Sequence, residues 1–375
     1  MDIQDIRNYN NTYKSKYQPS ERLSRYIEGK SIDCLPYSLN GSDFAVMNKL
    51  GITTSQFMEN KKNQYEVIKI KQEELGIFEE LIGIPTATFV NSQQMVPENG
   101  IPFIIKHFLD DYSKFSDLPK IHKDYYFIDN IANKYDDIKE KFPRTEFRII
   151  CNAPWSTAAK IRSVDQLLKD TRKNKSELLD LLKYSNDFII TSIEQICDKI
   201  GKTSVMIMDP ISCNDLLSEV QFEKWSLPFL KEFTNEISKL TGYDPILHIC
   251  GHTKKLWKFI SDLNLLYFSI DNCESLKELS ESYGDKLMIS GNVPPLDILK
   301  FGTINDVVDG VSKCIYDGYK NKKGIVIDAG CQLPIGVPYE NIEAYVYAIR
   351  KTSNEIINSE SDKMILGVNN EGNNN

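Results

Sequence analysis

The feature of this sequence that most constrains the fold is a recurring alternation of short apolar, β-branched runs with longer segments of helical periodicity. Eight runs stop at polar or turn residues and are predicted to be strands, at residues 34–39, 87–90, 147–151, 205–209, 246–250, 266–271, 286–290 and 324–329. The intervening segments with apolar residues at three- and four-residue steps are predicted to be helices, at residues 164–200, 222–240, 254–263, 304–319 and 339–356. Strands that alternate with helices form parallel sheets, and eightfold alternation favours an α/β fold of the closed (β/α)8 TIM barrel type.

An open, doubly wound sheet is the main alternative architecture. Such sheets normally carry a glycine-rich nucleotide turn, and this sequence contains neither G-x-G-x-x-G nor G-x-x-x-x-G-K. We therefore expect a single barrel domain over residues 1–360, with an N-terminal helical extension over residues 1–33 and long early insertions at residues 41–83 and 91–145. The polar residues 361–375 are low in complexity and are expected to be a disordered tail.

Composition argues against a nucleic-acid partner and a membrane partner, and it favours a cytoplasmic protein. The chain of 375 residues has a formal net charge of -8, whereas a nucleic-acid-binding protein would be expected to present a basic surface. It has no run of about 18 apolar residues and no apolar signal core near Met1, so neither a membrane span nor export is expected and the protein is predicted to be cytoplasmic. In that compartment its eight cysteines are expected to be thiols or metal ligands rather than disulfides.

Sulfur and imidazole groups stand at the carboxyl ends of two predicted strands. The active site of a barrel lies at these ends, because the loops that lead from strand to helix gather there. His248 and Cys250 are two residues apart on one strand, so they are expected to point to the same side, into the barrel mouth. Cys331 follows the eighth predicted strand, and the fold would bring it to the same rim.

Two thiolates and an imidazole with an open fourth position are typical of a catalytic zinc site. A structural zinc site would have four protein ligands, commonly from C-x-x-C pairs, and the sequence has no such pair. The alternative is that the cysteines are buried core thiols and that His248 is a hydrogen-bonded polar group; the pattern alone leaves both interpretations open. The fourth position could hold water, substrate or a nearby catalytic carboxylate, for which Asp271, at the end of the next strand, is the first choice and Glu274 the second.

Three more polar residues stand at strand ends and are candidates for contact with a cofactor at the barrel mouth. These are Asn152, Asp209 and Asn292. Asp209 could act as a general base. An aspartate in such a turn more often holds the following loop through backbone amides. The other histidines are expected to lie in loops or insertions at the surface, at His107, His122 and His252.

Several of these segments resemble one family. The stretches E-R-L-S-R-Y-I-E-G-K-S-I-D-C-L-P, N-A-P-W-S-T-A, D-P-I-S-C-N-D-L-L-S and S-G-N-V-P-P-L-D-I-L-K-F-G-T are similar to the opening and to strand-end loops of the uroporphyrinogen decarboxylase superfamily. The pair H-I-C-G and A-G-C-Q-L-P resembles the zinc-ligand pattern of its cobalamin-dependent methyltransferase branch, of the methylcobamide:coenzyme M type. The resemblance runs over nearly the whole chain, and it implies that His248, Cys250 and Cys331 are zinc ligands.

The resemblance also implies a reaction. The expected activity is transfer of a methyl group from methylcobalamin to a thiol such as coenzyme M, with Zn2+ lowering the pKa of the thiol so that its thiolate attacks the methyl group. None of the four histidines lies in the D-x-H-x-x-G pattern that would hold a corrinoid, so the methyl donor is expected to arrive on a separate corrinoid protein. Whether the acceptor is coenzyme M, another thiol such as homocysteine or a folate stays open.

Two other functions compete with this one. A metal-free lyase that acts on a tetrapyrrole, like uroporphyrinogen decarboxylase itself, would need a cluster of arginines for the carboxylates of its substrate. That branch carries an M-R-Q-A-G-R type motif near its N-terminus, where this chain has P-Y-S-L-N-G-S-D. A non-catalytic partner of a corrinoid protein is the third hypothesis, and turnover of free methylcobalamin with thiols would exclude it.

Overall fold

The computed structural model describes residues 1–359, so the predicted tail 361–375 lies outside the described residues. The chain divides into two compact units. Unit 1 consists of Met1–Phe78 together with the chain from Ser269 onward, and unit 2 consists of Glu79–Phe268. The prediction that residues 1–360 form one domain stays a prediction.

The main sheet of the described residues has seven strands in the order β1-β4-β5-β6-β7-β8-β9. Four pairs of neighbouring strands run parallel: β1 with β4, β4 with β5, β5 with β6, and β8 with β9. Because helices separate most of these strands along the chain, the fold is an α/β fold of the TIM-barrel type, as predicted. The strands are β1 (Glu79–Gly83), β4 (Glu146–Asn152), β5 (Ser204–Met208), β6 (Ile246–Ile249), β7 (Tyr267–Ile270), β8 (Ile289–Val293) and β9 (Ile325–Ala329).

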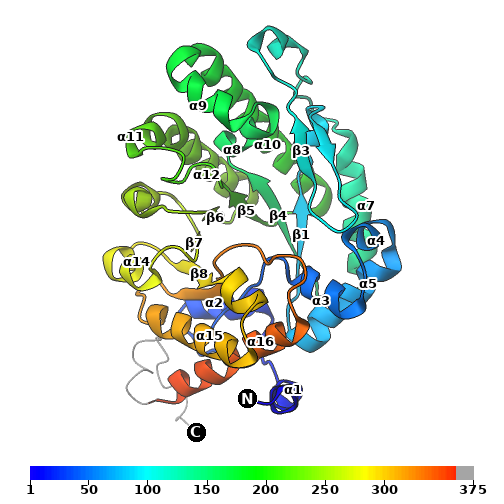
Figure 1. Ribbon diagram of the computed structural model, residues 1–375, viewed down its shortest axis with the longest axis vertical. Coiled ribbons are helices and arrows are strands. Elements are labelled where there is room, and N and C mark those ends of the chain that lie inside the picture. Colours follow the sequence, from blue (N-terminus) through cyan, green and yellow to red (C-terminus); the bar gives the residue numbers. More distant parts are fainter. Residues whose placement is uncertain (360–375) are drawn as a thin grey trace. The chain divides into compact units, whose positions relative to one another are not determined.

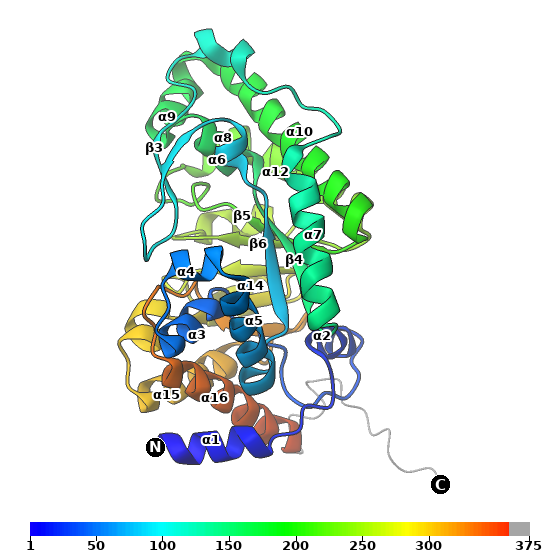
Figure 2. The ribbon, with the colours of Figure 1, turned by 90° about the vertical axis from the view of Figure 1, so that its right-hand side faces the viewer.

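In unit 2, helices cover the strands because their apolar residues recur at three- and four-residue steps. The longest helix, α10 (Lys175–Ile200), buries Leu178, Leu182 and Ile189, and it packs against α7, α8, α9 and α12. Figure 2 shows α7 and α10 side by side, and Figure 1 shows α9 beside α10. The other bounds are α7 (Tyr126–Lys141), α8 (Pro154–Ile161), α9 (Val164–Lys173), α11 (Glu219–Gln221), η3 (Phe222–Ser226), α12 (Leu227–Thr241), η4 (Lys254–Leu256) and α13 (Trp257–Ile260).

In unit 1, β8 and β9 lie against a layer of helices that includes α15 (Ile304–Gly318) and α16 (Tyr339–Asn358). All five residues of β9 are buried, and four of them are apolar, with Asp328 as the exception. The N-terminal helix α1 (Ile3–Thr12) packs along α16 (Figure 2). The remaining helices are α2 (Pro19–Ile27), α3 (Ser42–Leu50), α4 (Thr54–Glu59), α5 (Lys61–Ile70), η1 (Lys71–Leu75), α14 (Leu276–Tyr283) and η5 (Pro295–Lys300).

Three of the eight predicted strands differ from the structure: 87–90, 34–39 and 286–290, of which the last is shifted to β8. Residues 87–89 belong to the short helix α6 (Thr86–Phe89), which begins directly after Pro85, and Val90 is its C-cap. The strand lies earlier, at β1. The sequence pattern does not predict β1, because Glu79 and Glu80 interrupt its apolar residues, and an edge strand tolerates such charged residues. Glu79 forms an ion pair with Arg148 of β4 at 2.6 Å.

The predicted strand at residues 34–39 is reduced to one parallel bridge, between Tyr37 and Ile327. The Ile327 N–H donates to the Pro36 carbonyl at 2.9 Å, and the Ser38 N–H donates to the Ile327 carbonyl at 3.0 Å. Proline has no N–H to donate, so the segment follows β9 without forming a regular ladder.

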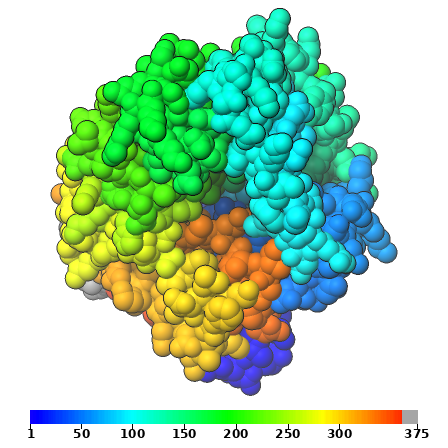
Figure 3. Space-filling view, turned by 45° about the horizontal axis from the view of Figure 1, so that its top comes forward, coloured from blue at the N-terminus to red at the C-terminus, as the bar shows by residue number. Residues whose placement is uncertain are grey.

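The predicted early insertions carry structure of their own. Residues 91–125 contain the hairpin of β2 (Gln93–Met95) and β3 (Phe103–Lys106), followed by η2 (Tyr112–Asp117). The Arg162 guanidinium donates to the Asp110 carbonyl at 2.5 Å, and the Tyr112 hydroxyl donates to Asp170 of α9 at 2.9 Å. These contacts fasten the insertion to unit 2, and Figure 3 shows the cyan surface of this segment next to the green surface of the α9 and α10 region.

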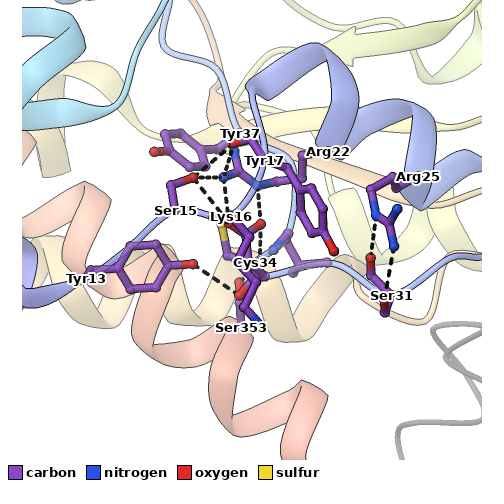
Figure 4. Close-up of polar contacts among 12 residues, drawn as sticks. Tyr13, Ser15, Lys16, Tyr17, Arg22, Arg25, Ser31, Cys34, Tyr37 and Ser353 are labelled. Atoms are coloured by element: carbon purple, nitrogen blue, oxygen red, sulfur yellow. Dashed lines mark hydrogen bonds and ion pairs between the residues drawn. The ribbon is translucent and has the colours of Figure 1, made fainter. Parts of the chain in front are cut away.

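A buried polar cluster holds the N-terminal segment in unit 1 (Figure 4). Nε of Arg22, in α2, lies 2.7 Å from Oδ1 of Asp33, and both side chains are almost fully buried. The same guanidinium donates to the Ser15 hydroxyl at 2.6 Å, and the Lys16 N–H donates to Asp33 at 2.8 Å. Burial of Asp33 would raise the pKa of its carboxyl, but the hydrogen bond and charge of Arg22 hold that pKa below its ordinary value.

None of the helices within residues 1–359 combines the length and the apolar character that crossing a membrane requires.

Candidate metal centre

β6 places an imidazole and a thiol side by side. All four residues of the strand are buried, and His248 is the third of them, in register with Met208 of β5. Cys250 follows the last strand residue, Ile249, and its Sγ lies 3.2 Å from Nε2 of His248. The i, i+2 spacing therefore brings both side chains to one side of the strand, as predicted.

The second thiol follows β9. The buried run Ile325–Ala329 leads directly into Gly330 and Cys331. The Gly330 N–H donates to the Val293 carbonyl at the end of β8, at 2.9 Å. Cys331 is therefore held at the carboxyl end of the strand pair, where the sequence places it.

The structure groups the three predicted ligands. One donor atom each from His248, Cys250 and Cys331 forms a set in which all atoms lie within 4.8 Å of one another. His248 is buried and both cysteines are partly exposed. One nitrogen and two sulfur donors at such separations can hold a metal ion of borderline softness such as zinc.

The predicted fourth ligand is not in this group, as far as the described residues show. Asp271 lies in the turn after β7, where its Oδ1 accepts a hydrogen bond from the Cys273 N–H at 3.1 Å. Its carbonyl accepts a further hydrogen bond from the Glu274 N–H at 3.2 Å. The roles of Asp271 and Glu274 at the metal stay predictions.

Gly330 has no room for a side chain. A Cβ at this position would lie 2.4 Å from the backbone nitrogen and 2.7 Å from the Cβ of Asn272, in the turn after β7. Real Cβ atoms do not approach other heavy atoms so closely, so either this turn or the backbone before Cys331 would have to move.

We expect Gly330→Ala to lower both stability and zinc content, because relief of this clash displaces the residue next to Cys331. Overpacking of this kind costs about 1–3 kcal/mol. Gly83→Ala is the matched control, since a Cβ at Gly83 would meet only Ile150, at 4.0 Å. Urea unfolding and metal analysis of both variants measure the effects. Unchanged zinc content and stability in Gly330→Ala would show that the turn after β7 can move at no measurable cost, and would contradict this prediction.

The other predicted site residues hold loops in place. The Asn292 amide donates to the carbonyls of Asp271 at 3.1 Å and Glu274 at 2.8 Å, so it fastens the turn after β7. The Asn152 amide donates to the Met208 carbonyl at 3.3 Å and joins the ends of β4 and β5. Contact of Asn152 and Asn292 with a cofactor stays a prediction.

Asp209 is fully buried at the end of β5 and accepts a hydrogen bond from the Ser156 hydroxyl of α8 at 2.5 Å. Its other carboxylate oxygen, Oδ2, has no hydrogen-bond partner. Burial raises the pKa of this carboxyl to about 6, against hydrogen bonds from Ser156 and Ser212 that lower it. Whether Asp209 acts as a general base or holds the following loop through backbone amides stays a prediction.

The remaining thiols and histidines have ordinary surroundings. None of the eight cysteines forms a disulfide bond, and Cys151 and Cys314 are buried in the core, where burial raises the pKa of the Cys314 thiol to about 12. His122 and His252 are exposed and His107 is partly exposed, as predicted for loops and insertions. His252 has a partner that sequence reasoning missed, Asp215, with Nδ1 2.9 Å from Oδ1. Nothing in the sequence singles out Asp215, because it lies 37 residues away from His252 and has no ligand spacing.

Comparison with protein families gives one match that covers most of the chain. The family described as uroporphyrinogen decarboxylase (URO-D) matches residues 18–352. This range includes the three grouped residues His248, Cys250 and Cys331.

Among curated proteins, the chain is 24% identical to a methylated-thiol--coenzyme M methyltransferase of Methanosarcina mazei over 225 residues, 60% of this chain and 57% of that protein. It is 26% identical to the methylcobamide:CoM methyltransferase MtaA of Methanosarcina barkeri over 199 residues, 52% of this chain and 55% of that protein. The chain thus spans little more than half the length of these relatives. Among solved structures, a methyltransferase from Methanosarcina mazei matches with a TM-score of 0.73 and 19% identity, over 90% of this chain and 99% of that chain, and this likeness concerns the fold.

Proposed function

Because this chain belongs to the uroporphyrinogen decarboxylase family, we propose that it is a zinc-dependent methyltransferase that transfers a methyl group from a methylated corrinoid to a thiol. The observation that carries the proposal is the group of His248, Cys250 and Cys331. Three protein ligands leave one position of a tetrahedral zinc ion for substrate, which is the arrangement of catalytic rather than structural zinc.

The chemistry of the donor set fits zinc. Thiolate and imidazole ligands suit zinc, whereas magnesium and calcium take oxygen ligands, and the group contains no carboxylate among the described residues. When bound there, zinc would supply the Lewis acidity that keeps an acceptor thiol deprotonated at neutral pH.

Some residues of the chain would bind the zinc ion, and others would hold these ligands in position. His248 and Cys250 come from one strand end, so the 3.2 Å between Nε2 and Sγ is set by a single stretch of backbone. Cys331 is positioned through Gly330, whose N–H donates to the Val293 carbonyl, and through the turn that Asn292 fastens. Two of the three donors thus share one strand end, and hydrogen bonds of a separate segment hold the third in place.

The activities of two relatives suggest both substrates. One relative is a methylcobamide:CoM methyltransferase and the other a methylated-thiol--coenzyme M methyltransferase. We propose that a separate corrinoid protein delivers the methyl group, since none of the four histidines lies in a D-x-H-x-x-G pattern. The proposed acceptor is a small thiol such as coenzyme M, with another thiol or a folate as the alternatives.

The proposal is tested by incubating the zinc-loaded protein with methylcobalamin and a panel of acceptors, and by following the cobalamin spectrum. We expect demethylation that requires both the protein and a thiol, with coenzyme M, homocysteine and a folate compared in parallel. Protein stripped of metal is the control. A preparation that binds less than about half an equivalent of zinc and leaves methylcobalamin intact with every acceptor would favour the metal-free lyase.

A further inference from the structure

Hydrogen bonds join two neighbouring loops beside Cys250. Asp215, in the loop after β5, accepts a hydrogen bond at Oδ2 from the His252 N–H at 3.0 Å, and its Oδ1 lies 2.9 Å from Nδ1 of His252, in the loop after β6. The Asn214 N–H donates to the His252 carbonyl at 2.7 Å. The Lys255 N–H donates to Oδ1 of Asn214 at 3.2 Å. We call the two contacts between Asp215 and His252 the Asp215 latch.

The latch packs closely against Gly251, the residue that follows Cys250. Gly251 lies between Cys250 and His252 and has a φ of +74°, a left-handed conformation that favours glycine. A Cβ on Gly251 would lie only 2.5 Å from Oδ2 of Asp215 and 3.3 Å from Sγ of Cys213. The Asp215 carboxylate is therefore packed directly against the backbone that leads from Cys250.

Both partners of the latch are at the surface. The side chain of His252 is 61% exposed and that of Asp215 is 51% exposed. Exposed ion pairs contribute little to the free energy of unfolding, so the latch is not expected to support the fold as a whole. Its effect is expected at the loop that it holds. Cys250 lies in this loop, one residue beyond the end of β6, so the regular strand ends before the thiol.

We propose that Asp215 is a positioning residue, which sets the place of the Cys250 thiolate at the metal centre by holding the backbone of Gly251 and His252. This inference rests on the proposed function, because it assumes that the group of His248, Cys250 and Cys331 binds zinc. Residues that hold metal ligands from outside the coordination shell change metal affinity by about 10- to 100-fold when they are replaced.

The test is the metal affinity of Asp215→Ala, measured by competition with a chromogenic zinc chelator. We expect zinc to bind about 10- to 100-fold more weakly than to the wild-type protein. Replacement of zinc by cobalt(II) supplies a second readout, because the charge-transfer and d–d absorption bands depend on the position of the thiolate. These bands are expected to change in energy or intensity, while the thermal unfolding midpoint stays close to that of the wild type.

Two further variants separate positioning from charge. Asp215→Asn removes the charge but keeps an oxygen that can accept from the His252 N–H, so it is expected to recover much of the affinity and the wild-type cobalt spectrum. Asp244→Ala is the matched control. Asp244 is another exposed aspartate of unit 2, and it accepts a hydrogen bond from the Ser238 hydroxyl at 2.7 Å, before β6 begins. Asp244→Ala is expected to bind zinc like the wild type.

The outcomes distinguish failure of this inference from failure of the proposed function. If the wild-type protein binds neither zinc nor cobalt(II), the proposed function fails. If the wild type binds both and Asp215→Ala has the same affinity and cobalt spectrum, only the role of Asp215 is overturned. An equal loss of affinity in Asp244→Ala, or no recovery in Asp215→Asn, would assign the effect to charge and also overturn the positioning role.

Discussion

Cys331→Ala is expected to lose zinc and methyl transfer while the protein stays folded. Cys331 supplies one of the three grouped donors, and two protein ligands do not hold zinc as three do. The residue is partly exposed and lies beyond the end of β9, so its loss should leave the packing of the core intact. Zinc per mole of protein, methylcobalamin turnover and circular dichroism measure the three properties. His248→Ala and Cys250→Ala are expected to behave in the same way.

Cys273→Ala is the matched control for this experiment. Cys273 is an exposed thiol of unit 1 and is not in the group of donors. Its replacement is expected to leave zinc content and turnover unchanged, so a general sensitivity to loss of thiols would be recognised. Zinc and activity retained in Cys331→Ala would refute the assignment of three ligands.

Arg22→Met is expected to cause the largest loss of stability that the fold predicts. The change removes the charge that faces Asp33, whose side chain is 4% exposed, and leaves a carboxylate buried without its partner. Breaking a buried pair in this way costs about 3–5 kcal/mol of the free energy of unfolding. Urea unfolding of wild type and variant measures the difference.

Arg25→Met is the control, because Arg25 lies on the same helix, α2, and donates instead to the backbone carbonyl of Ser31 at the surface, at 2.8 Å (Figure 4). Its loss is expected to cost less than about 1 kcal/mol. Equal losses of stability in the two variants would show that the buried Arg22–Asp33 pair contributes no more to the free energy of unfolding than a surface arginine does.

The pair also predicts a dependence on pH. The pKa of Asp33 is lower in the folded protein than its ordinary value, so its contribution to stability is complete above the unfolded-state pKa of about 3.9. That contribution is lost as the pH falls through the lower folded-state pKa. Asp33→Asn is expected to abolish this part of the acid dependence, which urea unfolding between neutral pH and about pH 3 would reveal.

Runs that are buried on both faces of the sheet could be predicted from the sequence. The strands β5, β6, β7 and β9, whose residues are mostly buried, lie where apolar, β-branched runs predict them, because a parallel sheet covered by helices favours apolar residues on both faces. β4 also lies where predicted, although only Ile149 and Cys151 of its residues are buried. β8 begins at Ile289, later than the predicted start at residue 286. The edge strand β1 could not be predicted, because two glutamates interrupt its apolar pattern. The partner of Glu79 is Arg148, which lies on the neighbouring strand β4.

The candidate metal ligands could also be predicted, two of them from local spacing and the third from the topology of the fold. Two positions of an extended chain that are two residues apart face the same side, so His248 and Cys250 are a local signal. Cys331 needed the topology of the barrel and the family resemblance, because 81 positions separate it from Cys250 in the sequence. The sequence did not predict that Asn292 fastens the turn after β7, because its partners are backbone carbonyls, which every residue has.

By itself, the sequence determined the order of strands and helices and the identity of the chemical groups at the strand ends, because periodicity and residue type are local properties. Only the tertiary structure decided how those groups are held. Asp215 meets the loop of Cys250 because β5 and β6 are neighbours in the sheet, and Gly330 excludes a side chain because the turn after β7 passes against it. Hydrogen bonds and steric contacts between distant segments carry no periodicity, so they appear only when the chain has folded.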